Sequence, residues 1–471
     1  MIELNTISKI YFIGIGGIGM SALAKYFNAK GLKVSGYDKT ATPIIRQMES
    51  EGITINYEDS IELLDKEAQL VVYTPAIPRD HRQLTFYQQN NYPIVKRSDV
   101  LQQITNDSFN ICIAGTHGKT TISTMVAHIL RDSEFGCTAF LGGVAVNYNT
   151  NFWSSDNNVC VVEADEYDRS FLKLKPDIAV ISAMDPDHLD IYGTEEAMQQ
   201  AFVDFSANIK PNGLLVSKFG LSKAGNLKAD NHIHYSLQND SADAYAANIK
   251  MNHGGYQFDV LTKDWMIDDV VLHMGGMHNV ENTVAAITVA HHLNIDNTKV
   301  RAAIKSFKGI KRRFEYVLAP SPLERAGSEA IYIDDYAHHP EELKALINGA
   351  KSLFSEMKCT IVFQPHLYSR TRDLSGEFAK SLDLADEIIL LPIYPARELP
   401  IKGVSSEMIL NKMNNKNSSV KTKDELLDYL KSSKVSTNDN LFITAGAGDI
   451  DAMVEPIKNI LLQKSTANNY V

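Results

Sequence analysis

The chain has 471 residues, of which 44% are hydrophobic and 22% are charged, and its formal net charge at pH 7 is −11. At about 150 residues per domain, this length and an ordinary globular composition predict about three domains. The acidic net charge and the lack of a basic stripe argue against nucleic-acid binding. No apolar run is long enough for a membrane span, and no signal peptide is apparent, so we expect a cytoplasmic protein.

The first predicted elements surround a glycine-rich turn. A strand at residues 9–13 leads into Gly14-Ile15-Gly16-Gly17-Ile18-Gly19, and a helix over 20–29 and a strand over 33–38 follow. The Gly-x-Gly-x-x-Gly spacing, with Asp38 about 20 positions later, is typical of a dinucleotide-binding βαβ unit, although the glycines alone are a weak signal.

Two further strands, at 70–73 and 93–95, extend this alternation. The turn from Thr74 through Ala76 falls at a strand's carboxyl end, where open α/β sheets bind ligands. We predict an N-terminal Rossmann-like domain over residues 1–107.

A phosphate-binding loop is predicted after the next apolar run. The run at 109–113 precedes Ala114-Gly115-Thr116-His117-Gly118-Lys119-Thr120-Thr121, and a helical pattern follows over 122–130. Backbone N–H groups of such a loop and the helix N-terminus attract phosphate, Lys119 can reach the terminal phosphates, and the Thr120 hydroxyl can ligate Mg²⁺. The glycines are closer together than in the common Gly-x4-Gly-Lys-Thr form, and an ordinary strand-to-helix turn is the alternative. We predict nucleoside-triphosphate binding.

Carboxylates follow the next predicted strand. Asn158 and the apolar residues 159–162 lead into Glu163-Ala164-Asp165-Glu166-Tyr167-Asp168. Glu163 is placed to ligate Mg²⁺, and His188 is a second candidate, although Mg²⁺ prefers oxygen ligands. A solvated acidic turn and a structural histidine are the alternatives. With β-rich sequence over 232–273 and a helix over 279–292, we predict a central P-loop ATPase-type α/β domain over residues 108–312.

The last part of the chain again alternates strands and helices. The predicted strands and a helix that begins at Pro340 indicate a C-terminal Rossmann-like parallel sheet over residues 313–471. Arg312 and Arg313 precede it, and arginine stabilises a transferring phosphoryl group, although a salt-bridged linker is the alternative. Arg370 and Arg372 follow a predicted strand, and their guanidinium groups suit a small carboxylate ligand, although ordinary surface arginines are the alternative. The predicted strands cover 331–333, 360–363, 387–391 and 440–444.

These motifs, in this order, resemble the Mur ligases, the ATP-dependent amide-bond-forming enzymes of peptidoglycan synthesis. The resemblance spans about residues 9–448 and is strongest to the members that add L-alanine to UDP-N-acetylmuramate. The segments that carry it are Phe12 to Met20, Ala114 to Thr121, Glu163 to Glu166, Asp187-His188, His278-Asn279-Val280-Glu281-Asn282, Arg312-Arg313, Asp334 to Pro340, Phe363 to His366, Ser369 to Asp373 and Tyr394 to Glu398.

The resemblance implies a role for each part of the chain. The first domain would hold the UDP-sugar, the second would bind ATP, and the third would place L-alanine. The sugar-binding residues would be Gly14, Gly16, Gly17, Gly19, Asp38, Thr74 and Ala76. The ATP-binding residues would be Gly115 to Thr121, with His278, Asn279 and Asn282 at the adenine and Asp335 at the ribose. Thr120, Glu163 and His188 would bind Mg²⁺, and Lys119, His188, Arg313, His338 and Arg370 would be catalytic, with His338 and Arg370 on L-alanine.

The sequence departs from the family pattern at two places. Leu367 stands where many relatives have a basic residue, and residues 201–205 contain no lysine for the carbamate that several sibling ligases carry. We expect a monomer or weak homodimer. The alternatives are a family member that recycles a murein tripeptide onto the same UDP-sugar, a dehydrogenase built on the first glycine motif, and a non-catalytic ATP-dependent switch.

Overall fold

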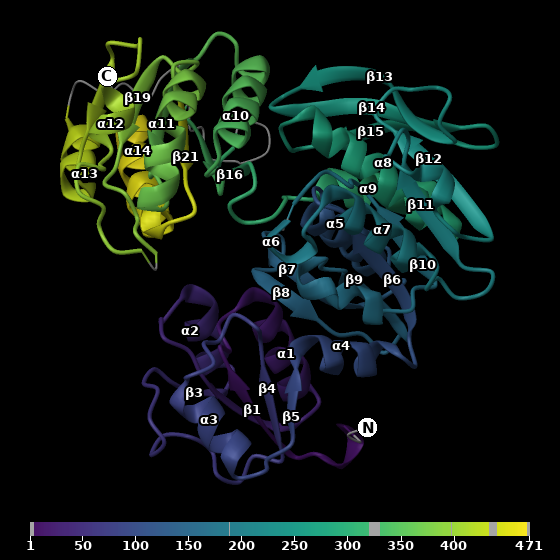
Figure 1. Cartoon of the computed structure of the whole chain (residues 1–471). Coiled ribbons are helices and arrows are strands. Elements are labelled where there is room, and N and C mark those ends of the chain that lie inside the picture. The colour runs from purple at the N-terminus through teal and green to yellow at the C-terminus, as the bar shows by residue number, and fades with distance from the viewer. Residues whose placement is uncertain (1–3, 188, 320–329, 397, 433–439, 469–471) are drawn as a thin grey trace. The chain divides into compact units, whose positions relative to one another are not determined.

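The computed structural model describes residues 4–187, 189–319, 330–396, 398–432 and 440–468 (Figure 1). The chain forms two compact units. The first contains Met1–Ala247, Val260–Ile267 and Glu281–Ile304, and the second contains Asn248–Asp259, Asp268–Val280 and Lys305–Val471. Their strands form a five-stranded, a ten-stranded and a six-stranded sheet. The predicted three-part α/β architecture is therefore confirmed.

The N-terminal sheet has the strand order β3-β2-β1-β4-β5, and every neighbouring pair is parallel. Apolar side chains fill β1 and β4, which lie where the sequence predicts them. The first helix begins two residues before its predicted start. The elements are β1 (Lys9–Ile13), α1 (Ile18–Ala29), β2 (Lys33–Tyr37), α2 (Pro43–Ser50), β3 (Thr54–Asn56), β4 (Leu70–Tyr73), α3 (Arg82–Gln89), β5 (Ile94–Lys96) and α4 (Arg97–Thr105), after a short 3₁₀ helix η1 (Leu4–Thr6).

The central sheet has the order β15-β14-β13-β12-β11-β10-β6-β9-β7-β8. Strands β6, β9, β10 and β11 pair in parallel, whereas β7 and β8 form an antiparallel pair. The strands are β6 (Phe109–Ala114), β7 (Thr138–Ala145), β8 (Thr150–Trp153), β9 (Val159–Glu163), β10 (Ile178–Ile181), β11 (Leu214–Lys218), β12 (Asn231–Ser236), β13 (Ala244–Asn252), β14 (Gly255–Thr262) and β15 (Met266–Leu272). The helices are α5 (Lys119–Asp132), η2 (Tyr167–Lys173), α6 (Leu189–Tyr192), α7 (Glu195–Ser206), η3 (Ala224–Asn226), α8 (Met277–His292) and α9 (Asn297–Ser306).

The C-terminal sheet has the order β16-β17-β21-β18-β19-β20 and is parallel except for its edge strand β16. The antiparallel edge is a difference from the all-parallel sheet that the sequence predicts. Pro340 begins α10, as predicted. The elements are β16 (Glu315–Leu318), β17 (Ile331–Asp335), α10 (Pro340–Leu353), β18 (Lys358–Phe363), α11 (Tyr368–Leu382), β19 (Glu387–Leu390), α12 (Glu407–Leu410), β20 (Ser418–Val420), α13 (Lys423–Lys431), β21 (Asn440–Ala445), η4 (Asp449–Met453) and α14 (Val454–Asn468).

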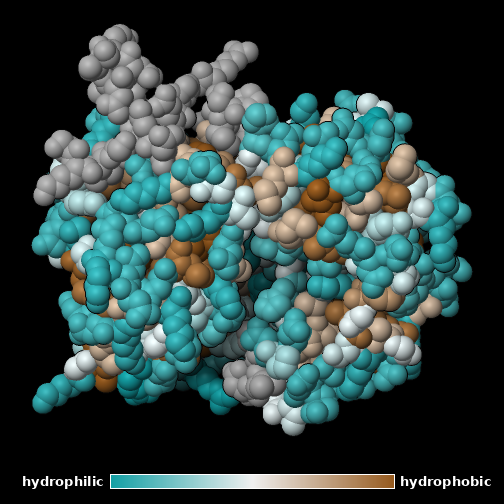
Figure 2. Space-filling model, turned by 90° about the horizontal axis from the view of Figure 1, so that it is seen from above, coloured by the Kyte–Doolittle hydropathy of each residue, from teal (hydrophilic) through white to brown (hydrophobic). Residues whose placement is uncertain are grey.

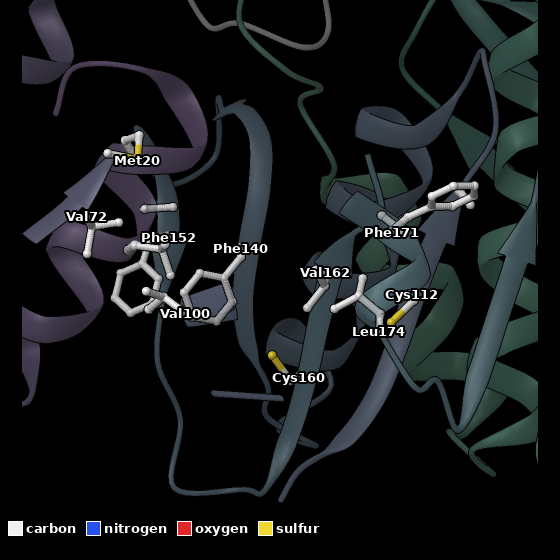
Figure 3. Packing of buried hydrophobic residues seen from close by; sticks show 14 of the residues in the cluster. Met20, Val72, Val100, Cys112, Phe140, Phe152, Cys160, Val162, Phe171 and Leu174 are labelled. Atoms are coloured by element: carbon white, nitrogen blue, oxygen red, sulfur yellow. The ribbon is translucent and has the colours of Figure 1, made fainter. Parts of the chain in front are cut away.

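One hydrophobic core joins the N-terminal and central sheets of the first unit. Phe140 of β7 and Phe152 of β8 belong to the same buried cluster as Val100 of α4, and these three side chains lie close together in Figure 3. The ring centroid of Tyr26 on α1 is 5.5 Å from that of Phe140. Because Lys25 of α1 also donates to Thr150 Oγ1 at 3.2 Å, the first glycine turn and the phosphate loop are held within one packed body.

On the face drawn in Figure 2, hydrophilic side chains cover most of the described surface. Among the described residues, no helix combines the length and the apolarity that crossing a membrane requires.

Candidate functional site

The predicted phosphate loop connects β6 to α5 in the first unit. Gly115 and Gly118 have φ angles of +131° and +83°, which side-chain-bearing residues rarely adopt. A Cβ atom on Gly115 would lie 2.3 Å from Ser182 Oγ and 2.7 Å from the Ala183 nitrogen, so this position has no room for a side chain. The Thr116 N–H donates to Ala183 O at 3.2 Å, and the Ser182 hydroxyl donates to His117 O. The end of β10 therefore holds the loop in its turn, and Thr121 is buried behind it.

Lys119 begins α5 and forms a buried ion pair. Its Nζ lies 2.8 Å from Glu166 Oε1 and donates to Gly115 O at 2.6 Å. The side chain of Glu166 is 1% exposed, and Tyr192 donates to its main-chain oxygen. Burial raises the pKa of the Glu166 carboxyl, and the neighbouring Lys119 opposes that rise. The Lys119 ammonium is thus held at the helix N-terminus, where an anion is also favoured.

Thr120 and Glu163 form the predicted oxygen-ligand pair. Thr120 Oγ1 donates to Glu163 Oε1 at 3.2 Å, and the Gly142 N–H donates to Glu163 Oε2 at 3.0 Å. A hydroxyl and one carboxylate beside a phosphate loop fit Mg²⁺, which usually keeps several waters and binds substrate phosphates. No group of three or more His, Cys, Asp or Glu side chains suited to a metal occurs among the described residues. His188 lies outside the described residues.

The first glycine turn lies at the carboxyl end of β1. The Gly16 N–H donates to Asp38 Oδ2 at 2.8 Å, so the predicted acidic residue orders the turn itself. Gly14 has φ +83°, and a Cβ atom there would lie 3.6 Å from Thr74 Cγ2. Gly17 precedes the first residue of α1, and the Ala76 N–H donates to Thr74 Oγ1. The structure therefore brings the predicted sugar-site residues of β1, β2 and β4, together with Gly19 on the first turn of α1, to one edge of the sheet.

The predicted adenine residues lie on the first turns of α8. Asn279 is 3% exposed and its Nδ2 donates to Gly275 O at 2.7 Å. Asn282 is 7% exposed, and its Oδ1 would lie 2.8 Å from a Cβ atom on Gly118. Asn282 thus lies against the phosphate loop within the first unit. His278 and Asn279 belong to the second unit.

In the second unit, the two consecutive arginines differ in their surroundings. The Arg312 guanidinium donates to Gly446 O and forms a 3.4 Å ion pair with the buried Asp334, whereas Arg313 is exposed. Asp335 ends β17 and accepts the N–H groups of Phe314 and Ala337, each at 2.7 Å. Burial raises the pKa of Asp335 to about 6. Arg312 is held inside the fold, and Arg313 is the exposed member of the pair.

The two residues predicted for the amino acid lie in one cluster with a third. The rings of His338 and His366 are 6.0 Å apart, and Arg370 lies on the first turn of α11. Burial lowers the pKa of both imidazoles, and the Arg370 charge lowers both further. His338 Nδ1 lies 3.0 Å from Tyr336 O, which can only accept, so Nδ1 carries the hydrogen and Nε2 carries the lone pair. His366, like Glu166, was not among the predicted site residues.

The sequence signals for the two unpredicted residues were present but not specific. Glu166 is the last residue of the Glu-Ala-Asp-Glu run, and His366 ends Phe-Gln-Pro-His. Sequence spacing alone does not indicate which carboxylate of a turn points to Lys119.

Comparison with known proteins identifies the family. Residues 9–109, 113–290 and 312–448 match the Mur ligase family catalytic domain, the Mur ligase middle domain and the Mur ligase glutamate ligase domain. A Cytophaga hutchinsonii protein named UDP-N-acetylmuramate–L-alanine ligase is 43% identical over 98% of each chain. A Porphyromonas gingivalis protein of the same name is 45% identical over 96% of this chain and 99% of its own.

A solved structure agrees with these relatives. The crystal structure of UDP-N-acetylmuramate-alanine ligase MurC from Thermotoga maritima has a TM-score of 0.80 and 27% identity, covering 98% of this chain and 99% of that chain. Because the identity to curated relatives exceeds 40% over nearly the whole length, this chain belongs to the Mur ligase family.

Proposed function

We propose that the protein joins L-alanine to the lactyl carboxylate of UDP-N-acetylmuramate, using ATP and releasing ADP and phosphate. The observation that carries this proposal is the set of contacts at the phosphate loop, Lys119 with Glu166 and Thr120 with Glu163, in the same packed unit as the first glycine turn. The names of the relatives supply the identity of the substrates.

Activation of the carboxylate is the first chemical need. The lactyl carboxylate attacks the γ-phosphorus of ATP, the bond to the β-phosphate oxygen breaks, and an acyl phosphate and ADP form. The Lys119 ammonium and the N-terminus of α5 lie where negative charge gathers, and fixed positive groups there lower the barrier. Mg²⁺, held by Thr120 and Glu163, would add charge neutralisation.

Amide formation is the second step. The neutral amine of L-alanine attacks the acyl carbon, a tetrahedral intermediate forms, the carbon–oxygen bond to phosphate breaks, and the nitrogen loses a proton. His338 is suited to this step because the lowered pKa keeps its imidazole neutral near pH 7 and Nε2 carries the lone pair. The Arg370 guanidinium suits the carboxylate of L-alanine.

The finer parts of the proposal follow the same reasoning. We propose that ATP binds at Gly115 to Thr121, with Asn279 and Asn282 at the adenine. We place the domain boundaries at residues 107/108 and 312/313. The protein acts in the cytoplasm as a monomer or weak homodimer, with no nucleic-acid or membrane partner.

The test is phosphate release from ATP by the purified full chain. We expect release only when UDP-N-acetylmuramate and L-alanine are both present. Stimulation by the murein tripeptide in place of L-alanine would assign the protein to the recycling reaction instead. Lys119→Ala should abolish release, whereas Lys210→Ala, which removes another paired lysine of the same unit, should retain it. Release within tenfold of wild type by Lys119→Ala would remove the loop from the mechanism.

A further inference from the structure

The side chain of Arg97 lies between the first glycine turn and the carboxylates that follow β9. Arg97 is the first residue of α4, and a Cβ atom on Gly19 would lie 2.2 Å from its Nη1 atom. Its Nη2 atom donates to Asp165 Oδ2 at 3.2 Å. One guanidinium therefore contacts the start of α1 and the Glu-Ala-Asp-Glu turn.

A small cavity of about 100 Å³ connects these two features. Gly19 and Arg97 line it from the N-terminal sheet's side, and Gly142, Glu163 and Asp165 line it from the central sheet. All of these residues belong to the first unit, so their arrangement is fixed by the shared core. The cavity thus extends from the predicted diphosphate turn to the predicted metal carboxylate.

The ion pair with Asp165 does not by itself explain why the Arg97 side chain lies against the first turn of α1. The Arg97 side chain is 28% exposed and that of Asp165 is 36% exposed, and partly exposed pairs contribute little to stability. A guanidinium that rests against the first turn of a helix is, in contrast, well placed for an anion bound at that helix N-terminus. Arginine binds phosphate through two parallel hydrogen bonds, which a lysine at this position would not reproduce.

We propose that Arg97 is a further substrate-binding residue, whose guanidinium binds the diphosphate of the UDP-sugar at the start of α1. Before the substrate binds, Asp165 holds the guanidinium in place. This inference rests on the proposed function, because it takes the UDP-sugar as the ligand of the glycine turn.

The experiment compares Arg97→Met and Arg97→Lys with two control variants. Asp165→Asn removes the partner of Arg97 but keeps the guanidinium. Lys96→Met removes the neighbouring ion pair with Asp168, in which the two atoms are 3.3 Å apart, and Lys96 does not line the cavity. The readouts are the KM values for all three substrates, direct calorimetric binding of UDP-N-acetylmuramate and UDP-N-acetylglucosamine, and the thermal unfolding midpoint.

We expect Arg97→Met to raise the KM for UDP-N-acetylmuramate by about 10- to 100-fold, the loss typical of hydrogen bonds to a charged group, with the KM values for ATP and L-alanine within about threefold of wild type. Arg97→Lys should recover only part of this loss. The affinities for the two UDP-sugars should fall by the same factor, because both sugars carry the diphosphate and only UDP-N-acetylmuramate carries the lactyl carboxylate. Lys96→Met should stay within about threefold of wild type in every KM, and Asp165→Asn should raise the KM for UDP-N-acetylmuramate less than Arg97→Met does, because it keeps the guanidinium.

Three results would overturn the inference. Equal effects of Arg97→Met and Asp165→Asn on KM would mean that the ion pair is only structural. Weaker binding of UDP-N-acetylmuramate alone would show that Arg97 contacts the lactyl carboxylate and not the diphosphate. An unchanged KM would show that Arg97 is not part of the binding site. Failure of the wild-type protein to use UDP-N-acetylmuramate and L-alanine would refute the proposed function separately.

Discussion

Removing the ammonium of Lys119 should destabilise the protein in a pH-dependent way. In Lys119→Ala, the Glu166 carboxylate, whose side chain is 1% exposed in the wild-type protein, loses the cation 2.8 Å away. Breaking a buried pair by removing one partner costs about 3–5 kcal/mol, and for a domain of about 200 residues this lowers the unfolding midpoint by about 6–20 °C.

The pH dependence follows from the direction of the Glu166 pKa. Burial already raises this pKa above the usual 4.5, and loss of Lys119 removes the opposing influence. A folded state with a raised carboxyl pKa binds a proton that the unfolded state releases, so its stability falls as pH rises from about 4.5 through the folded-state pKa. The deficit of Lys119→Ala relative to wild type should therefore be larger at pH 8 than at pH 5.

A double-mutant cycle in scanning fluorimetry completes the test. Glu166→Gln removes the charge but keeps the shape, so Lys119→Ala/Glu166→Gln should unfold at a higher temperature than Lys119→Ala at pH 8. A deficit that is the same at both pH values, or no recovery in the double variant, would refute the buried-pair reasoning.

Three further predictions concern other parts of the fold. Gly115→Ala should abolish ATP binding and destabilise by about 2–5 kcal/mol, since φ is +131° and a Cβ atom would collide with the Ala183 nitrogen; calorimetry with ATP and melting curves check this. Arg370→Met should raise the KM for L-alanine about 10- to 100-fold with the KM for ATP unchanged in steady-state kinetics. Asp334→Asn should make the stability of the protein less dependent on pH. Burial raises the pKa of Asp334 to about 7, so wild-type stability falls as pH rises from about 4 to 7. Melting midpoints measured across this range would detect the slope in the wild type and its loss in the variant.

Much of the strand and helix pattern could be predicted because local signals agree with the fold. The apolar runs at 9–13 and 70–73 became β1 and β4, and Pro340 begins α10 because its fixed φ suits a first helical turn. The antiparallel β7–β8 pair was not predicted. Its residues mix glycine, asparagine and aromatic side chains, and they are ordered by packing against α1, which sequence periodicity does not encode.

The motifs of the candidate site could be predicted from the sequence, but the contacts between its side chains could not. The Gly-Lys-Thr sequence and the strand before it located the turn between β6 and α5, because both depend on neighbours in sequence, although the helix begins at Lys119 and not at residue 122. The pairing of Lys119 with Glu166 spans 47 residues, and that of Arg97 with Asp165 spans 68. Asp165 and Glu166 lie in the turn that leads into η2, where Asp168 has a φ of +54°, and no local pattern predicts the conformation of that turn.

The Glu-Ala-Asp-Glu turn gives each of its three carboxylates a different partner. Glu163 faces the Thr120 hydroxyl, Asp165 holds Arg97, and Glu166 holds Lys119. Two cations, which under the proposed function face anionic ligands, are therefore each paired with a carboxylate of one turn. This lowers the repulsion between them and fixes their positions, so that a phosphate group finds both already oriented. Each ligand must then compete with a carboxylate, and the competition is stronger at Lys119 because Glu166 is buried, whereas Asp165 is partly exposed to solvent. The turn consequently binds the Lys119 ammonium more firmly than the Arg97 guanidinium, and Asp165→Asn should release its partner at a smaller loss of stability than Glu166→Gln.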